Sequence, residues 1–263
     1  MRRGEEELRQ RCERLRRFDR DVDPQAWAAG RLAGVDEAGV GPLAGPVVAA
    51  AVVLPCDFDL PELFDSKQMT AAARRRCEAF IRAHALGFGV ARISPRGIER
   101  LNILRAMLEA HRRALRALPV VPEVVLVDGR RAPRLPSGWS ATRLQVVVKA
   151  DAQSLAVAAA SVLAKETRDR IMRRLDRRYP QYGFRHHMGY STREHMEALR
   201  RFGPSPVHRP RFCRFLEIEA LLARQGQLPF AAASGAQLDG LPREAVDDAA
   251  WQSAGTEPLA PHP

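Results

Sequence analysis

The sequence is poor in cysteine and in long apolar runs, and each shortage excludes a class of protein. Its four cysteines form no Cys-x-x-Cys pair, which excludes the common zinc-binding and thioredoxin-like spacings. The longest apolar stretch, residues 46–55, is far shorter than the roughly 20 residues that span a bilayer. The N-terminus is charged from Arg2 onward and lacks the apolar segment of a secretory signal. We therefore expect a cytoplasmic protein that does not enter a membrane.

Acidic residues are scarce relative to basic ones. The chain has 31 acids against 42 lysines and arginines, a net charge of +11, and only three of the basic residues are lysines. Residues 225–263 hold five acids and one arginine, so the positive charge is concentrated in residues 1–224. This balance favours a polyanionic partner, most often nucleic acid, although solvated arginines give the same composition.

The distribution of apolar residues divides the chain into three parts. In residues 1–30, apolar side chains spaced by three and four predict an amphipathic helix that extends the N-terminus. Residues 31–224 contain the strands and helices of one α/β domain. Residues 225–263 are rich in Gly, Ala, Pro and Gln without periodicity, which predicts a disordered tail.

Within residues 31–224 the pattern predicts strands that alternate with helices. One strand leads into Asp36, and Leu155–Ala164 is so apolar that it must be buried. The other strands are expected at 46–54, 87–93, 123–127 and 144–148, and the helices at 70–84, 95–118, 154–178, 192–202 and 211–224.

Acidic residues stand at the ends of three predicted strands. These are Asp36 with Glu37, Asp128 and Asp151. Because neighbouring strands lie about 4.8 Å apart, such acids can gather at one edge of a sheet. Clustered carboxylates repel one another, and Mg²⁺ or Mn²⁺ removes that penalty. Two such ions support phosphodiester hydrolysis. Any one of these acids alone is equally typical of a turn.

Asp36 and Glu37 are adjacent and point to opposite faces in a regular strand. Gly34, Gly39 and Gly41 surround them, and we expect these glycines to let the backbone bend and redirect the two acids.

An ordered series of motifs runs through about residues 31–216. It opens with Gly34-Val-Asp-Glu-Ala-Gly-Val-Gly-Pro-Leu-Ala-Gly-Pro-Val-Val48. It continues with Asp65-Ser66-Lys67, Asn102-Ile103, Val127-Asp128-Gly129, Lys149-Ala150-Asp151, residues 159–165, Thr167-Arg168-Asp169, residues 179–184, His187-Met-Gly-Tyr190 and His208-Arg209. This ordered series resembles one known family, ribonuclease HII.

The resemblance implies an α/β fold with a ribonuclease H-like mixed five-stranded sheet flanked by helices and a helical C-terminal portion. It implies a metal-dependent endoribonuclease that acts on RNA–DNA hybrids and on ribonucleotides embedded in duplex DNA. Cleavage on the 5′ side of the ribonucleotide leaves a 3′-hydroxyl and a 5′-phosphate. We expect a monomer.

The resemblance also assigns roles to individual residues. It makes Asp36, Glu37, Asp128 and Asp151 the catalytic ligands of two Mn²⁺ or Mg²⁺ ions. It assigns the turn Gly39-Val40-Gly41 to the ribose 2′-hydroxyl, Tyr190 to the sugar 3′ of the ribonucleotide, and Lys67 to the scissile phosphate.

Two positions depart from the family pattern. A basic residue is usual where this chain has Val40, and a lysine is usual where it has Met188. Each change removes a cation that can contact phosphate, whereas recognition by the backbone of Gly39 and Gly41 needs no side chain. Arg185 and Arg193 are nearby candidates to replace the missing charge.

Three alternatives stay open at this level. A resolvase or transposase with the same fold uses similar carboxylates but needs no reader of the 2′-hydroxyl. The related ribonuclease HIII usually carries an extra N-terminal domain, for which residues 1–30 are too few. A nucleic-acid-binding protein without activity would not need all four carboxylates.

The tail contains a short motif of a different kind. Gln225-Gly-Gln-Leu-Pro-Phe230 fits a Gln-x-x-Leu-x-Phe pattern that resembles peptides bound by bacterial sliding clamps. A chance match is the competing interpretation, and the motif predicts a clamp as a possible partner.

Overall fold

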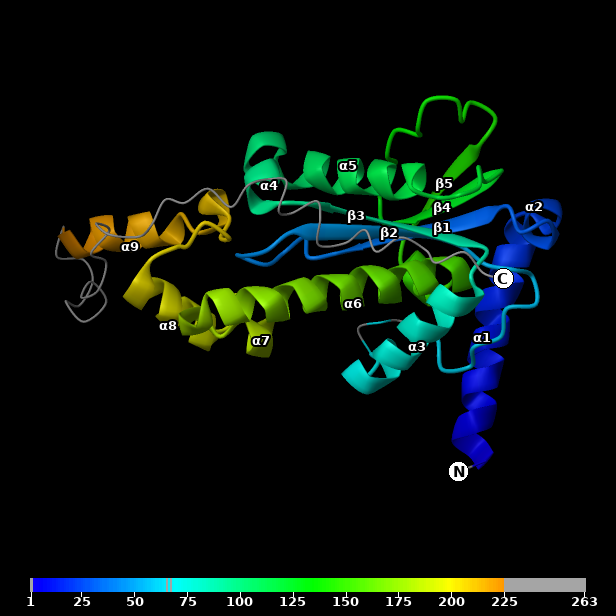
Figure 1. Cartoon of the computed structure of the whole chain (residues 1–263), viewed down its shortest axis with the longest axis horizontal. Helices are drawn as coiled ribbons and strands as arrows, with labels where there is room; N and C mark the ends of the chain where they lie inside the picture. Colours follow the sequence, from blue (N-terminus) through cyan, green and yellow to red (C-terminus); the bar gives the residue numbers. More distant parts are fainter. Residues whose placement is uncertain (1, 65, 67, 225–263) are drawn as a thin grey trace. The chain divides into compact units, whose positions relative to one another are not determined.

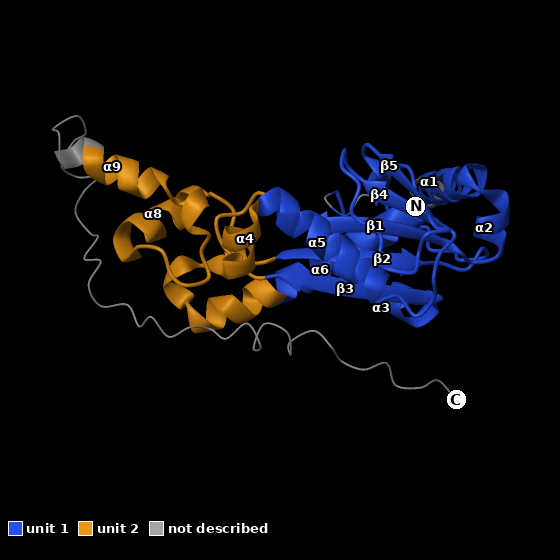
Figure 2. Ribbon diagram, turned by 90° about the horizontal axis from the view of Figure 1, so that it is seen from above, with its two compact units in different colours: residues 1–40, 47–93, 103–170 blue, residues 41–46, 94–102, 171–263 orange. Residues whose placement is uncertain are grey.

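The computed structural model describes residues 2–224 except residues 65 and 67. The chain forms two compact units, coloured separately in Figure 2. Of the described residues, those within 2–40, 47–93 and 103–170 form unit 1, and those within 41–46, 94–102 and 171–224 form unit 2. Two sequence predictions, for Lys67 and for the tail 225–263, lie outside the described residues.

Unit 1 is built on a five-stranded sheet in the order β3-β2-β1-β4-β5. The strand β1 pairs antiparallel with β2, which pairs antiparallel with β3, whereas β1, β4 and β5 are parallel. This confirms the mixed sheet that the sequence predicted. The strands are β1 (Leu32–Ala38), β2 (Val47–Val53), β3 (Gly87–Ile93), β4 (Val124–Asp128) and β5 (Arg143–Val147).

Helices cover both faces of this sheet (Figure 1). The helix α5 (Ile103–Arg116) packs on β1, β2 and β3. The first part of α6 (Leu155–Arg178) lies on the opposite face with α1 (Arg2–Val22) and α3 (Ala71–His84). Residues 47–53 and 155–164 are buried throughout, as their apolar composition predicted.

Gly34 sets how closely β1 approaches α6. A Cβ at this position would lie 2.2 Å from the carbonyl carbon of Ala156 and from the nitrogen of Val157. The sequence interpretation that Gly34 lets the strand bend is therefore wrong. Gly34 has a regular place in β1, and its missing side chain makes room for the helix backbone.

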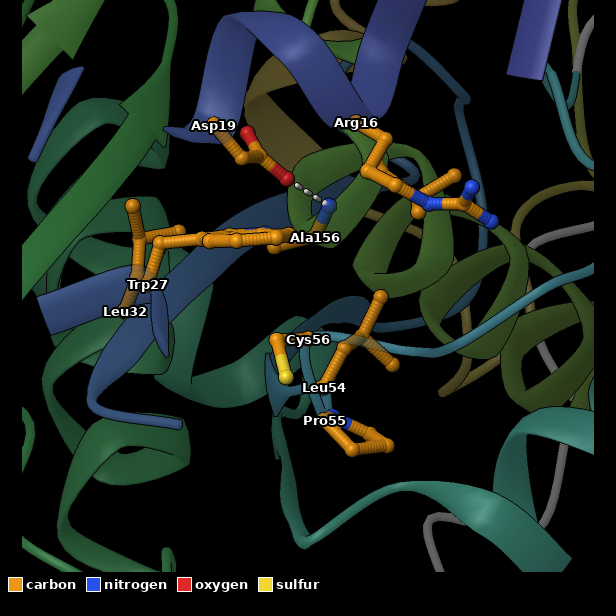
Figure 3. Close-up of a pocket in the computed structure, with 9 residues that line it drawn as sticks. Arg16, Asp19, Trp27, Leu32, Leu54, Pro55, Cys56 and Ala156 are labelled. Carbon is orange, nitrogen blue, oxygen red and sulfur yellow. Dashed lines mark hydrogen bonds between the residues drawn. The ribbon is translucent and has the colours of Figure 1, made fainter. Parts of the chain in front are cut away.

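The N-terminal helix is integrated into unit 1. Cys12 and Leu15 belong to the same hydrophobic cluster as α6, and α2 (Pro24–Ala28) follows α1. The buried Asp19 carboxylate accepts a hydrogen bond of 2.9 Å from the backbone nitrogen of Ala156, near the start of α6. Burial raises the pKa of Asp19 to about 7. Figure 3 shows this contact beside a cavity of about 10 Å³ that Trp27 also lines.

Unit 2 is helical and has its own core. Buried members of this core include Tyr182, Phe184, Leu199 and Val207. Its elements are α4 (Pro95–Leu101), the end of α6, the 3₁₀ turn η2 (Pro180–Tyr182), α7 (Phe184–His187), α8 (Arg193–Phe202), η3 (Pro210–Phe212) and α9 (Phe215–Arg224).

The structure corrects two predicted helices. The helix expected over residues 95–118 is divided into α4 and α5, because Asn102 has a φ of 66° and cannot continue the helical path. The helix expected over residues 211–224 begins with η3, and α9 starts only at Phe215. Among the described residues, no helix has the length and apolar character needed to cross a membrane.

Candidate active site

The strand register brings two of the predicted acids together. Val35 of β1 pairs in parallel with Val127 of β4, so the next residues, Asp36 and Asp128, are neighbours across the two strands. Asp128 ends β4, whereas Asp36 lies within β1 and not at its end.

Asp151 reaches the same place from beyond β5. It lies in the 3₁₀ turn η1 (Ala150–Ala152), which follows Lys149 with its left-handed φ of 57°. The backbone nitrogen of Ala150 donates a hydrogen bond of 2.7 Å to Oδ1 of Asp128 and so connects this turn to β4. As a result, carboxylate oxygens of Asp36, Asp128 and Asp151 all lie within 4.8 Å of one another.

Electrostatic repulsion within this group is severe. Asp36 is only 3% exposed, and burial, with the nearby charges of Glu37 and Asp128, raises its pKa well above the usual range. Two hydrogen bonds oppose this shift, one from the side chain of Ser161 on α6 and one of 2.7 Å from the backbone nitrogen of Glu37. Ser161 in turn contacts the hydroxyl of Ser66 at 2.7 Å. An oxygen-only donor set with excess negative charge fits a hard divalent cation such as Mg²⁺ or Mn²⁺.

Glu37 points to the other face of the sheet, as strand alternation requires, and lies outside the group of three. Its Oε2 is 2.8 Å from Nε2 of His111, a fully buried residue of α5. The Nδ1 atom of His111 is buried without a hydrogen-bond partner among the described residues. No local spacing in the sequence indicates a partner 74 residues away, so the structure alone reveals this contact. The role of Glu37 as a metal ligand stays a prediction.

The two glycines of the predicted turn differ in what the fold requires. Gly39 has a φ of 91°, a conformation that favours glycine. Gly41 has no such φ, and a Cβ there would meet no atom within 4 Å. Gly39 and Val40 belong to unit 1, and Gly41 belongs to unit 2. The fold thus explains Gly39 and leaves Gly41 without a structural reason.

Tyr190, in unit 2, has an exposed side chain and a firmly held backbone. Its side chain is 45% exposed, and its carbonyl oxygen is 2.9 Å from Nδ1 of the buried His195. The Nε2 atoms of His195 and His208 are 3.0 Å apart. Burial lowers the pKa of His195 to about 4 and that of His208 to about 3, so both rings are neutral at pH 7.

Hydrogen bonds determine which nitrogen of each ring carries the proton. Nδ1 of His208 accepts from the backbone nitrogen of Ser205, so its Nε2 donates to His195. Nδ1 of His195 then donates to Tyr190. Sequence reasoning missed this series of hydrogen bonds because neutral buried histidines have no distinctive spacing.

Met188 stands where a lysine is usual, and two nearby arginines, Arg185 and Arg193, are the candidates to replace its charge. Met188 has a φ of 51°, and the two arginines considered as replacements for its missing charge both have acidic neighbours. Arg193 forms an ion pair of 2.7 Å with Glu197, and Arg185 lies 3.7 Å from Asp176. Whether either arginine contacts substrate stays a prediction.

Comparison with known proteins gives a consistent result. A family model described as ribonuclease HII matches residues 33–215. Ribonuclease HII of Geobacillus kaustophilus is 49% identical over 214 residues, which are 80% of this chain and 78% of that protein.

Solved structures show the same fold. Ribonuclease H2 from Pyrococcus horikoshii is 27% identical with a TM-score of 0.58, over 71% of this chain and 97% of that one. A Bst ribonuclease HIII structure in complex with Mn²⁺ is 21% identical with a TM-score of 0.56, over 76% of this chain and 73% of that one. The second likeness concerns the fold alone.

Proposed function

Because the chain belongs to the ribonuclease HII family, and is therefore an endoribonuclease of the ribonuclease H type, we propose that it hydrolyses RNA in RNA–DNA hybrids and beside ribonucleotides embedded in duplex DNA. Cleavage on the 5′ side of the ribonucleotide leaves a 3′-hydroxyl and a 5′-phosphate, which suits the removal of ribonucleotides from DNA. The observation that carries this proposal is the group formed by Asp36, Asp128 and Asp151, within 4.8 Å in a chain of net charge +11.

In the proposed site, Asp36, Glu37, Asp128 and Asp151 hold two divalent ions, Mg²⁺ or Mn²⁺. The ions supply activation of water and stabilisation of the leaving oxygen when bound. The repulsion that raises the pKa of Asp36 supports this assignment, because cations favour the ionised carboxylates.

Neighbouring groups of the chain orient these carboxylates. The Ser161 side chain donates to Asp36, the Ala150 nitrogen donates to Asp128, and His111 contacts Glu37. Such contacts fix the direction of a ligand and thereby the geometry of a metal centre.

The proposed reader of the ribose 2′-hydroxyl is the turn Gly39-Val40-Gly41. The open space at Gly41 supports this role, because a bare backbone there serves the approach of a ligand and not the packing of the fold. Val40 contributes no charge. We assign the exposed ring of Tyr190 to the sugar 3′ of the ribonucleotide and Lys67 to the scissile phosphate.

The test uses three labelled duplexes that contain one ribonucleotide, a long RNA tract or DNA only. The wild-type protein is expected to cut the first two with Mg²⁺ or Mn²⁺ and to leave the third intact. Asp128→Asn keeps the shape of the side chain and is expected to lower kcat by a factor on the order of 10³, because a ligand charge is lost. Asp21→Asn removes an exposed acid of α1 and serves as the control. A wild-type protein that cuts neither ribonucleotide-containing duplex would overturn the proposal.

A sliding clamp remains a proposed partner through Gln225–Phe230, a segment outside the described residues. A synthetic peptide of this segment is expected to bind a bacterial clamp, and a variant with alanine at Leu228 and Phe230 is expected not to bind. Equal binding of both peptides, or no binding at high micromolar concentration, contradicts the assignment.

A further inference from the structure

A cleft of about 430 Å³ in unit 1 is lined in part by the residues that directly follow Asp151. One wall is α1, which contributes Arg11, Arg14 and Phe18. The other walls come from Phe64 and Gln68 before α3, and from Gln153 after η1.

One wall of the cleft continues the 3₁₀ turn η1, which carries Asp151. Ala152 and Gln153, which line it, directly follow Asp151 and are exposed. The amide of Gln153 donates hydrogen bonds of 2.8 Å and 3.2 Å to the carbonyl oxygens of Val148 and Lys149. These bonds hold the wall of the cleft to the loop that carries Asp151.

The described arginine side chains of α1 differ in their partners, and Arg9, which does not line the cleft, forms no ion pair with a described carboxylate. Arg16 pairs with Glu13 and Asp59, and Arg17 and Arg20 lie near Asp21. Arg11 and Arg14, which line the cleft, form no ion pair with any described carboxylate. Their charges are therefore available to an anion from outside.

The cleft also presents apolar surface beneath these charges. The guanidinium of Arg11 lies 4.7 Å from the centroid of the Phe64 ring, which holds it over the aromatic wall. Leu15 and Phe18 line the same space. Cationic groups above an apolar wall match a sugar–phosphate backbone, in which phosphates alternate with the carbon surface of the sugars.

We propose that this cleft binds the sugar–phosphate backbone of the substrate duplex beside the cleavage position, with Arg11 and Arg14 on its phosphates. The proposal rests on the proposed function, because it gives the same substrate a second binding region. It makes α1 a part of the nucleic-acid interface. Duplexes that extend into the cleft then bind more tightly than duplexes too short to reach it.

The experiment compares Arg11→Ala/Arg14→Ala with Arg9→Ala/Arg17→Ala. Both variants remove two positive charges from α1, but Arg9 and Arg17 do not line the cleft. KM and kcat are measured on single-ribonucleotide duplexes that are lengthened in steps on either side, at three salt concentrations. The cleft variant is expected to raise KM about tenfold on long duplexes with little change in kcat. The slope of log KM against log salt concentration is expected to fall by the amount that corresponds to about two phosphate contacts.

On short duplexes the cleft variant is expected to match wild type, and the control is expected to match wild type at every length. Arg14→Glu, a single change at an exposed position, is expected to give the same trend and answers the concern that losing the Arg11–Phe64 contact alters folding. Equal KM and salt slope in the cleft and control variants would overturn the proposal. A change in oligomeric state without a change in KM would overturn it too, since the cleft would then bind a second copy.

Binding of an uncleaved all-DNA duplex, measured by fluorescence anisotropy, separates this proposal from the proposed function. If the wild-type protein cuts no duplex but the cleft variant still binds long DNA more weakly than the control, the proposed function fails and the cleft assignment stands.

Discussion

Replacing Asp128 with asparagine is expected to stabilise the protein when no divalent metal is bound. The carboxylate oxygens of Asp36, Asp128 and Asp151 lie within 4.8 Å of one another, and Asp36 is buried. Two full charges at that distance repel by about 3.5 kcal/mol at an effective dielectric constant of about 20. Asparagine removes this repulsion and keeps the oxygen that accepts the hydrogen bond from Ala150.

The expected gain is smaller than the full Coulomb energy. Burial, with the repulsion from Glu37 and Asp128, raises the pKa of Asp36, so part of the repulsion is already relieved by proton binding in the wild-type protein. We therefore expect the free energy of unfolding to rise by about 1–3 kcal/mol, and Tm to rise by about 2–4 °C for each kcal/mol.

The assay is thermal and urea unfolding at pH 8 in EDTA and in Mg²⁺ or Mn²⁺. In EDTA the variant is expected to be more stable than wild type, and divalent metal is expected to reduce or reverse the difference because it binds the intact group more tightly. The Asp21→Asn control is expected to show neither effect. A variant that is less stable than wild type in EDTA, or that gains as much from metal, would refute the reasoning.

Three further predictions follow from individual contacts. Gly34→Ala is expected to destabilise the protein by at least about 3 kcal/mol in urea unfolding, because its Cβ would collide with the backbone of Ala156; Gly41→Ala, which meets open space, is the comparator and is expected to change stability little. Asp19→Asn tests the pKa of about 7: the folded state holds this proton more tightly than the unfolded state, so wild-type stability that is present below about pH 4 is lost as pH rises through 7. The stability of the variant relative to wild type should therefore rise over that window, and a difference independent of pH would contradict the shift. Val40→Arg is expected to lower KM and to steepen its salt dependence by about one phosphate contact with little change in kcat, and unchanged KM and salt slope would show that this position does not face phosphate.

Elements with local determinants could be read from the sequence. The Thr70 side chain accepts a hydrogen bond from the backbone nitrogen of Ala73 and caps the helix that follows. Threonine is a preferred residue at this position, so the start of the helix could be predicted. The strand β2 follows a run of apolar residues whose burial needs no knowledge of its partners. The sequence predicted that Asp36 and Asp128 gather because both acids were placed at the ends of strands, whereas the pairing of β1 with β4 that brings them together comes from the structure.

Features that depend on distant partners could not be predicted. The break between α4 and α5 rests on the left-handed backbone of Asn102, which a helical apolar pattern on both sides conceals. The contact of Glu37 with His111 requires knowing which helix covers that face of the sheet. Position 34 must be glycine because the backbone of a helix more than a hundred residues later packs against it, and no local sequence pattern shows that contact.

The hydrogen bond between Asp19 and Ala156 bears on where this protein can be shortened. The region matched by the family model starts at residue 33, so a chain trimmed to it would lose α1. The start of α6 would lose its carboxylate partner, and the apolar surface now covered by Cys12 and Leu15 would meet water. The start of the family model and the start of the packed unit therefore fall at different residues. Limited proteolysis that removes residues 1–30 should loosen the same helix that carries Ser161 to the active site.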